Sequence, residues 1–279
     1  MTTRHQKQSK TNFSTVQIKK IGTQSLAAAS VTVILLTSAH GALVGRDING
    51  VAVSGSSASA VFLYDTDLNI TWLRNANAAA GSSFDNGFDT TDGYMTWANA
   101  NNWANTLKVG SYSGWRLPTM VDTGAPGCDG YDYAGGTECG FNVQTATSEM
   151  AHLYYVSLGN LAYCPPGDAT CASGPQLGWG LTNTGSFQNL QPHFYWSGAE
   201  YGPTLVNAWY FGLYAWVFDT NVGLQDAYLK TEGLPAMAVR PGDVAAAQVP
   251  EPGTLLLAAL ALAGMGVVRR RRPLGASAL

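Results

Sequence analysis

Short stretches in which apolar and polar residues alternate predict β-strands along most of the chain. Residues 60–64 and 70–73 are two such strands, joined by a polar turn at residues 65–69. Further strands are predicted where aromatic and β-branched residues give the composition of a half-buried sheet. These strands cover residues 193–197, 208–218 and 236–240.

The turn at residues 65–69 carries oxygen side chains at alternate positions, as the start of a calcium-binding loop does. An EF-hand loop needs Gly at its sixth position and Glu at its twelfth, and this chain has Ile70 and Ala76 there. We therefore favour a turn whose Asp and Asn side chains accept hydrogen bonds from their own backbone.

An apolar period of three to four residues replaces this alternation in two segments and predicts helices there. The first covers residues 96–107, and one face of it should pack on a sheet. The second covers residues 148–158, with Thr147 as a candidate N-cap and Gly159 at its end.

Between the two predicted helices, residues 114–119 have the sequence Gly-Trp-Arg-Leu-Pro-Thr. We expect a structural corner in which Trp115 enters the core, Arg116 pairs with a carboxylate and Pro118 fixes the turn. A binding role for this segment is the alternative.

A continuous apolar run near the C-terminus, residues 254–268, predicts a separate transmembrane helix. The run is shorter than the about 20 residues of a comfortable span, which suits a temporary anchor. A basic tail, residues 269–279, follows it, and clustered cations stay on the cytoplasmic side of a membrane. The four cations that stop the helix are Arg269, Arg270, Arg271 and Arg272.

Residues 1–41 have the three regions of a secretory signal peptide: scattered cations, an apolar stretch, and small residues at the cleavage position. Cleavage after Gly41 is favoured, and cleavage after Ala39 fits nearly as well. An uncleaved anchor helix is the alternative. The secretion machinery would thus carry the folded part across the inner membrane, where the C-terminal helix anchors it for a limited time.

A linker, residues 244–253, stands directly before the apolar run, and it contains Pro250, Glu251, Pro252 and Gly253. This order of motif, single span and basic cluster resembles the PEP-CTERM sorting signal of exported proteins in Gram-negative bacteria. The resemblance implies recognition by an exosortase, a membrane-embedded cysteine protease. Cleavage near the motif would then release the protein or transfer it to the cell surface. An ordinary C-terminal anchor is the alternative.

The part of the chain between the signal peptide and the motif, residues 42–248, is strongly acidic. It holds six of the fifteen Lys and Arg residues and seventeen of the eighteen acids, which gives −11 against −3 for the whole chain. Such a domain repels nucleic acid and anionic polysaccharide. Neutral glycans, cations or protein neighbours are the expected partners.

The four cysteines, Cys128, Cys139, Cys164 and Cys171, all lie in the exported part, where an even number favours disulfides. Three pairings are open. We favour Cys128 with Cys139 and Cys164 with Cys171, because each pair closes a short loop. A zinc site is the alternative, but the CxxC spacing of such sites is absent.

Six segments recur in the order found in exported bacterial proteins that carry a domain similar to the C-terminal domain of the Legionella collagen-like adhesin (Lcl). They are residues 64–73, 95–98, 114–119, 148–153, 195–197 and 238–241. The resemblance covers nearly all of residues 42–243 and extends to the broader C-type-lectin-like group. It implies an α+β fold with two helices packed on a twisted antiparallel sheet, adjacent first and last strands, and long disulfide-tied loops.

No arrangement typical of catalysis occurs, so we expect no enzyme and no catalytic residues. Formylglycine-generating relatives act through late cysteines, and no cysteine follows Cys171. Only His152 and His193 remain after removal of the signal peptide, and His152 is interpreted as a hydrogen-bonded structural residue. We expect no metal site and no cofactor, with calcium as an open alternative.

Two kinds of side chain are candidates for ligand binding. Trp196 and Trp209 are candidates to stack on sugar rings, with core packing as the alternative. Asp219, Asn221 and Asp226 are expected in a polar loop after a strand, where they are candidates to hold a cation or are solvated turn residues.

The sequence thus predicts an exported surface or matrix protein that binds a glycan or another extracellular polymer. A structural matrix component without a specific ligand is one alternative. An enzyme acting on extracellular polysaccharide is the other.

Overall fold

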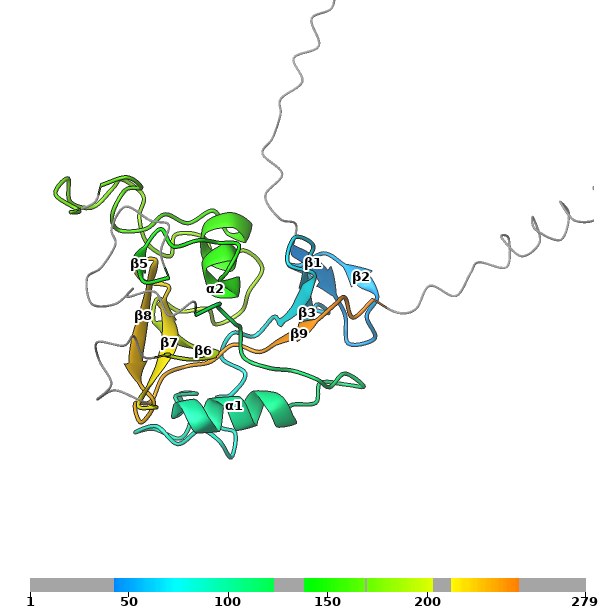
Figure 1. Cartoon of the computed structure of the whole chain (residues 1–279). Helices are drawn as coiled ribbons and strands as arrows, with labels where there is room; N and C mark the ends of the chain where they lie inside the picture. The colour runs from blue at the N-terminus through cyan, green and yellow to red at the C-terminus, as the bar shows by residue number, and fades with distance from the viewer. Residues whose placement is uncertain (1–42, 123–137, 169, 203–211, 246–279) are drawn as a thin grey trace, which may run out of the picture. The chain divides into compact units, whose positions relative to one another are not determined.

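The structure is a computed structural model that describes residues 43–122, 138–168, 170–202 and 212–245. These residues form two antiparallel sheets and two helical segments, so the fold is of the α+β kind (Figure 1). One sheet has five strands in the order β2-β1-β3-β4-β9, and the other has four in the order β5-β8-β7-β6. A single sheet was expected, and the division into two corrects that expectation.

The five-stranded sheet combines early strands of the chain with its last one. Its strands are β1 (Leu43–Arg46), β2 (Ala52–Val53), β3 (Phe62–Asp65), β4 (Ile70–Leu73) and β9 (Val239–Pro241). The predicted strands around the polar turn are β3 and β4. Since β9 pairs with β4, strands β3 and β4 separate it from β1. The expectation that the first and last strands are adjacent is therefore wrong, although one sheet contains both.

The turn between β3 and β4 is stabilised by Asp65, which is buried. Its Oδ1 accepts hydrogen bonds from the N–H groups of Asp67 at 3.1 Å and Leu68 at 3.2 Å. Its Oδ2 accepts a hydrogen bond from the Ser157 hydroxyl at 2.8 Å. The carboxylate thus accepts hydrogen bonds from its own turn, as the interpretation of an Asx-rich turn predicts, and also from one neighbouring helix.

The four-stranded sheet contains β5 (Gly140–Phe141), β6 (Phe194–Glu200), β7 (Tyr214–Asp219) and β8 (Leu224–Leu229). Neighbouring residues of β6 and β7 point to opposite faces. Trp196 and Val217 pack in the core that contains α1, while Tyr195 and Phe218 pack in the core that contains α2. Both faces of this sheet are therefore covered, which explains its near-continuous aromatic sequence.

Helix α1 (Trp97–Thr106) lies within one residue of the predicted bounds at each end, and its buried face is Ala100, Trp103 and Ala104. The second predicted helix consists of an α-helical part followed by a π-helical part. It begins as α2 (Glu149–His152) and continues as the π-helix η1 (Leu153–Ser157). Its N-cap is Ser148 rather than Thr147, because the Ser148 hydroxyl accepts the Ala151 N–H at 3.2 Å.

The predicted corner at residues 114–119 is confirmed. Trp115 is only 2% exposed and belongs to the core around α1. Two nitrogens of the Arg116 guanidinium donate to the two carboxylate oxygens of Glu149, each at 2.7 Å. The same carboxylate accepts the Thr119 N–H at 2.8 Å. One acidic residue of α2 thus ties the corner to the helix.

A disulfide joins Cys164 and Cys171, as predicted, with their Cα atoms 5.3 Å apart. Cys139 is also disulfide-bonded, and Cys128, its predicted partner, lies outside the described residues. No helix within the four described ranges has the length and apolar character of a membrane span. The signal peptide, the transmembrane helix at 254–268, the basic tail and Pro250 to Gly253 lie outside those ranges.

Candidate functional site

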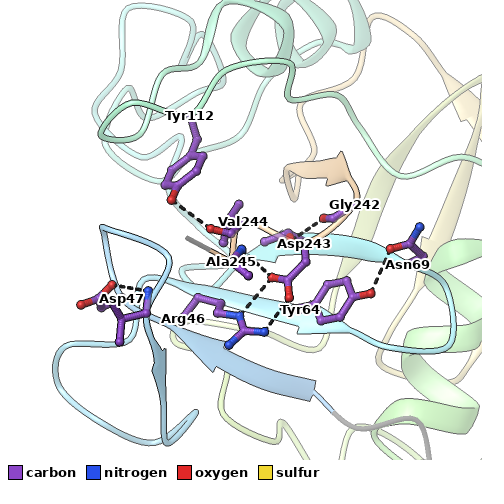
Figure 2. Close-up of polar contacts among 11 residues, drawn as sticks. Arg46, Asp47, Tyr64, Asn69, Tyr112, Gly242, Asp243, Val244 and Ala245 are labelled. Carbon is purple, nitrogen blue, oxygen red and sulfur yellow. Dashed lines mark hydrogen bonds and ion pairs between the residues drawn. The ribbon is translucent and has the colours of Figure 1, made fainter. Parts of the chain in front are cut away.

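The point at which the chain leaves its folded part towards the sorting motif is held by an ion pair. Arg46 on β1 donates to both carboxylate oxygens of Asp243, from Nε at 3.0 Å and from Nη2 at 2.5 Å (Figure 2). The hydrogen bond to Asp243 raises the pKa of the Arg46 guanidinium, so Arg46 stays charged. Asp243 Oδ1 also accepts the Ala245 N–H at 2.9 Å.

Neutral hydrogen bonds hold the residues on either side of Asp243 (Figure 2). The Thr71 hydroxyl donates to the Gly242 carbonyl at 2.7 Å, and the Tyr112 hydroxyl donates to the Val244 carbonyl at 2.9 Å. We call this set the exit clamp; its members are Arg46, Thr71, Tyr112 and Asp243.

The exit clamp limits how far the sorting motif can stand from the folded domain. Four residues separate Ala245 from Pro250. Because an extended chain spans at most about 3.6 Å per residue, a connection of this length reaches at most about 18 Å. A protease that recognises the motif must therefore work close to the domain surface.

The Arg46→Ala variant is expected to lose about 1–2 kcal/mol of unfolding free energy, because a bidentate pair is lost and Asp243 is left unpaired. The side chains are 15% and 23% exposed, which keeps the loss below that of a fully buried pair. Urea unfolding followed by tryptophan fluorescence measures it. Lys108→Ala removes an exposed cation as the control, and equal stability of the two variants would contradict the role of the clamp.

A second feature is a row of partly exposed rings contributed by β6, β8 and the loop before α1. The ring centroids of Tyr94 and His193 are 5.0 Å apart, and those of Phe194 and Tyr228 are 5.3 Å apart. His193 and Phe194 join the two pairs at 6.4 Å. We call these four residues the aromatic strip. Tyr228 is its most exposed member, at 37%.

The surroundings of the aromatic strip are polar, and the Tyr94 hydroxyl stays neutral. Burial raises the pKa of Tyr94, and the nearby Asp92 carboxylate adds to this shift. Burial also raises the pKa of the Asp219 carboxyl, which lies opposite Phe194 in the sheet. The Asn221 N–H, which donates to Asp219, lowers it in part. Rings bordered by polar groups are typical of surfaces that bind a partly apolar, partly hydroxylated ligand.

The two tryptophans predicted to bind a ligand are not members of the aromatic strip. Trp196 is fully buried, and its ring N–H donates to the Met95 carbonyl at 2.8 Å, so it belongs to the core and offers no face to a ligand. Trp209 lies outside the described residues. Phe194 and Trp196 point to the same face of β6. Phe194 is partly exposed because it begins the strand, whereas Trp196 lies farther into the core.

The three polar candidates are not in one loop. Asp219 ends β7, Asn221 lies in the following turn, and Asp226 lies within β8. The expectation of a polar loop at Asp226 is therefore wrong, because the chain reverses at residues 220–223 and continues as a strand. Among the residues that the structure describes, no cluster of three or more His, Cys, Asp or Glu side chains has the arrangement of a metal site.

The two histidines have different neighbours. His193 belongs to the aromatic strip. His152 lies in α2, and its Nε2 is 3.8 Å from the Asp67 carboxylate. Within the described ranges no hydrogen bond reaches that nitrogen, so the expected hydrogen bond is not found there.

Five of the six cations of the acidic domain, all but Lys108, make structural contacts. Arg74 donates to three backbone carbonyls, and Arg240 lies over the ring of Tyr112 at 5.5 Å. Lys230 also lies 4.4 Å from the ring centroid of Trp97. Three cations form ion pairs with carboxylates: Arg46 with Asp243, Arg116 with Glu149, and Lys230 with Glu200. A surface that binds anionic polymers needs cations that are not already paired.

The sequence did not point to Tyr94, Phe194 or Tyr228 as a group. Tyr94 lies in a loop before α1, and Tyr228 lies in a strand that was not predicted. The one sequence feature that pointed towards the strip was the aromatic content of residues 193–197. It indicates Phe194, but it indicates the buried rings of the same segment equally.

Comparison with known families finds a match to the PEP-CTERM protein-sorting motif at residues 248–272. The match includes Pro250 to Gly253, the apolar run and the four arginines, which together form the predicted sorting signal. No curated protein matches the chain. The motif points to export, processing by an exosortase and a location at the cell surface.

Proposed function

We propose that the folded domain of this exosortase-sorted protein binds a neutral extracellular glycan, or a polymer of similar chemistry, through the aromatic strip. The observation that carries the proposal is the continuous contact of four partly exposed rings from three separate segments of the chain. Sugars present apolar C–H faces that pack on such rings, and their hydroxyl groups bond to the polar groups at the rim.

Charge favours a neutral ligand over an anionic one. Residues 42–248 carry a net charge of −11, and three of their six cations are paired with carboxylates. An anionic polymer would meet repulsion that few cations offset. Binding rather than catalysis is the proposed role, and the cell surface or the extracellular matrix is the proposed place of action.

The domain is further proposed to belong to the Lcl C-terminal-like domains of the C-type-lectin-like group, over residues 42–243. Support comes from the ordered segments, the confirmed corner at Arg116 and the two helical segments on antiparallel strands. The pairing of β9 with β4 differs from the topology that the resemblance implies. An experimental structure in which β9 is adjacent to β1 would support the assignment, and confirmation of the present order would count against it.

The Tyr228→Ala variant is expected to bind the recognised glycan about tenfold more weakly, because one stacked ring contributes about 1.4 kcal/mol. A glycan array with and without calcium identifies the ligand, and titration calorimetry then measures both proteins. Phe88→Ala is the matched control, since Phe88 is a fully exposed ring outside the strip. A uniformly flat array would favour the structural matrix component. Equal affinities of the two variants would show that the binding site lies outside the aromatic strip.

A further inference from the structure

Residues 75–95, between β4 and α1, follow a long path without a regular helix or strand, and one buried acid organises it. Asp85 is only 4% exposed. Its Oδ2 accepts two backbone hydrogen bonds, from Gly81 at 2.9 Å and from Gly93 at 2.8 Å. The carboxylate thus joins two points of the loop that are twelve residues apart.

Two buried oxygen atoms of this loop lack a donor. Asp85 Oδ1 and the amide oxygen of Asn77 are both buried, and no hydrogen-bond donor of the described residues reaches either of them. Asp85 is also absent from the ion pairs found in the described part of the chain. An unpaired buried acceptor costs about 1–3 kcal/mol, and more when it is charged.

Asn77 and Asp85 hold the same peptide unit, one at its carbonyl and the other at its N–H. The Asn77 Nδ2 donates to the Asp92 carbonyl at 3.0 Å, while Asp85 accepts the N–H of Gly93 from the same peptide. Gly93 has a φ of +84°, and a Cβ atom there would lie 2.1 Å from the Asn77 oxygen. Glycine is therefore needed for Asn77 to bring its oxygen against this peptide.

Neither oxygen can satisfy the other, because an amide oxygen and an ionised carboxylate are both acceptors. A positive ion is a partner that either kind of acceptor can bind. Carboxylate and amide oxygens without nitrogen or sulfur partners are ligands that Ca²⁺ prefers. The Asp92 carboxylate nearby adds negative charge to the same loop.

We propose that Asp85 and Asn77 bind a Ca²⁺ ion that stabilises the loop of residues 75–95. The ion binds through Asp85 Oδ1 and Asn77 Oδ1, and backbone carbonyls and water complete its ligands. With one carboxylate, the expected dissociation constant is about 10⁻⁴–10⁻³ M, the range of extracellular calcium modules. This site differs from the two calcium candidates of the sequence, and it does not depend on glycan binding.

The test is the melting temperature of the full chain, purified in detergent and stripped with EDTA, as Ca²⁺ is titrated up to 10 mM. Calcium at ten times its dissociation constant is expected to raise the melting temperature by about 4 °C. Tb³⁺ luminescence sensitised by Tyr94, the residue next to Gly93, is expected to rise and to be displaced by Ca²⁺. The absence of any calcium-dependent shift in the unchanged protein would overturn the proposal.

Three variants assign the ion to this loop. Asp85→Asn keeps the shape of the side chain and is expected to lose the shift, whereas Asp89→Asn removes an exposed acid of the same loop and is expected to keep it. Asn77→Asp adds a second carboxylate and is expected to bind Ca²⁺ about tenfold more tightly. A dissociation constant that is unchanged in Asn77→Asp, or in a folded Asp85→Asn, would overturn the assignment.

Discussion

The Glu149→Ala variant is expected to lose about 2–3 kcal/mol of unfolding free energy. Its carboxylate accepts two hydrogen bonds from Arg116 and one from the Thr119 N–H, and all three are lost together. Hydrogen bonds to charged groups contribute about 1.5–3 kcal/mol each, but the Arg116 side chain is 30% exposed and regains part of this from water. Urea unfolding with the disulfides intact measures the loss.

A double-mutant cycle with Arg116→Met separates the pair from its surroundings. We expect the double variant to be less destabilised than the sum of the single variants, because each single change leaves an unpaired group behind. Glu232→Ala, an exposed acid after β8, carries the same change of charge and is expected to alter stability by no more than about 0.5 kcal/mol. Strict additivity in the cycle would show that the corner does not depend on this ion pair.

The Glu251→Ala variant is expected to remain uncleaved and membrane-associated. Glu251 is the only charged residue of the sorting motif before the apolar run. Loss of a charge-assisted contact of about 3 kcal/mol lowers the rate of processing about a hundredfold. Fractionation of the producing cells, with an epitope tag after Leu279 and a second tag in the domain, measures processing.

The matched control for this variant is again Glu232→Ala, which removes one negative charge far from the motif in sequence. It should be released at the normal rate and lose its C-terminal tag. Normal release of Glu251→Ala would contradict recognition of the motif by an exosortase, and would favour an ordinary C-terminal anchor.

Local patterns predicted the elements whose cause is local. Helix α1 follows from its apolar period, and the turn after β3 follows from the ability of Asp65 to bond its own backbone. The corner was also predictable, because a cation next to a core tryptophan in an acidic domain has carboxylates to pair with. In each case the contacts that form the element could be inferred from the types of the residues involved.

The division into two sheets has a cause that is remote in sequence. Strand β8 contains Gln225 and Asp226, and these polar residues suggest a loop when the sequence is considered alone. Only their pairing with β7 shows that they belong to a strand. The π-helix after His152 likewise depends on tertiary packing, since Tyr154 and Tyr155 both contact Phe218 of β7. Apolar periodicity does not distinguish this geometry from an α-helix.

The aromatic strip could not be predicted for the same reason. Tyr94, His193 and Tyr228 meet only after a loop, the start of β6 and the end of β8 have folded together. The same aromatic residue types occur in the core and on the surface, so the sequence pointed to Trp196, which is fully buried.

The exit clamp also has a mechanical consequence. Any pull on the tail enters the domain through β9, an edge strand whose hydrogen bonds to β4 would open one after another. Arg46 and Tyr112 divert this load to β1 and to the loop after α1 before it reaches β9. Such a pull therefore strains several elements in parallel, and the edge of the sheet is protected from peeling.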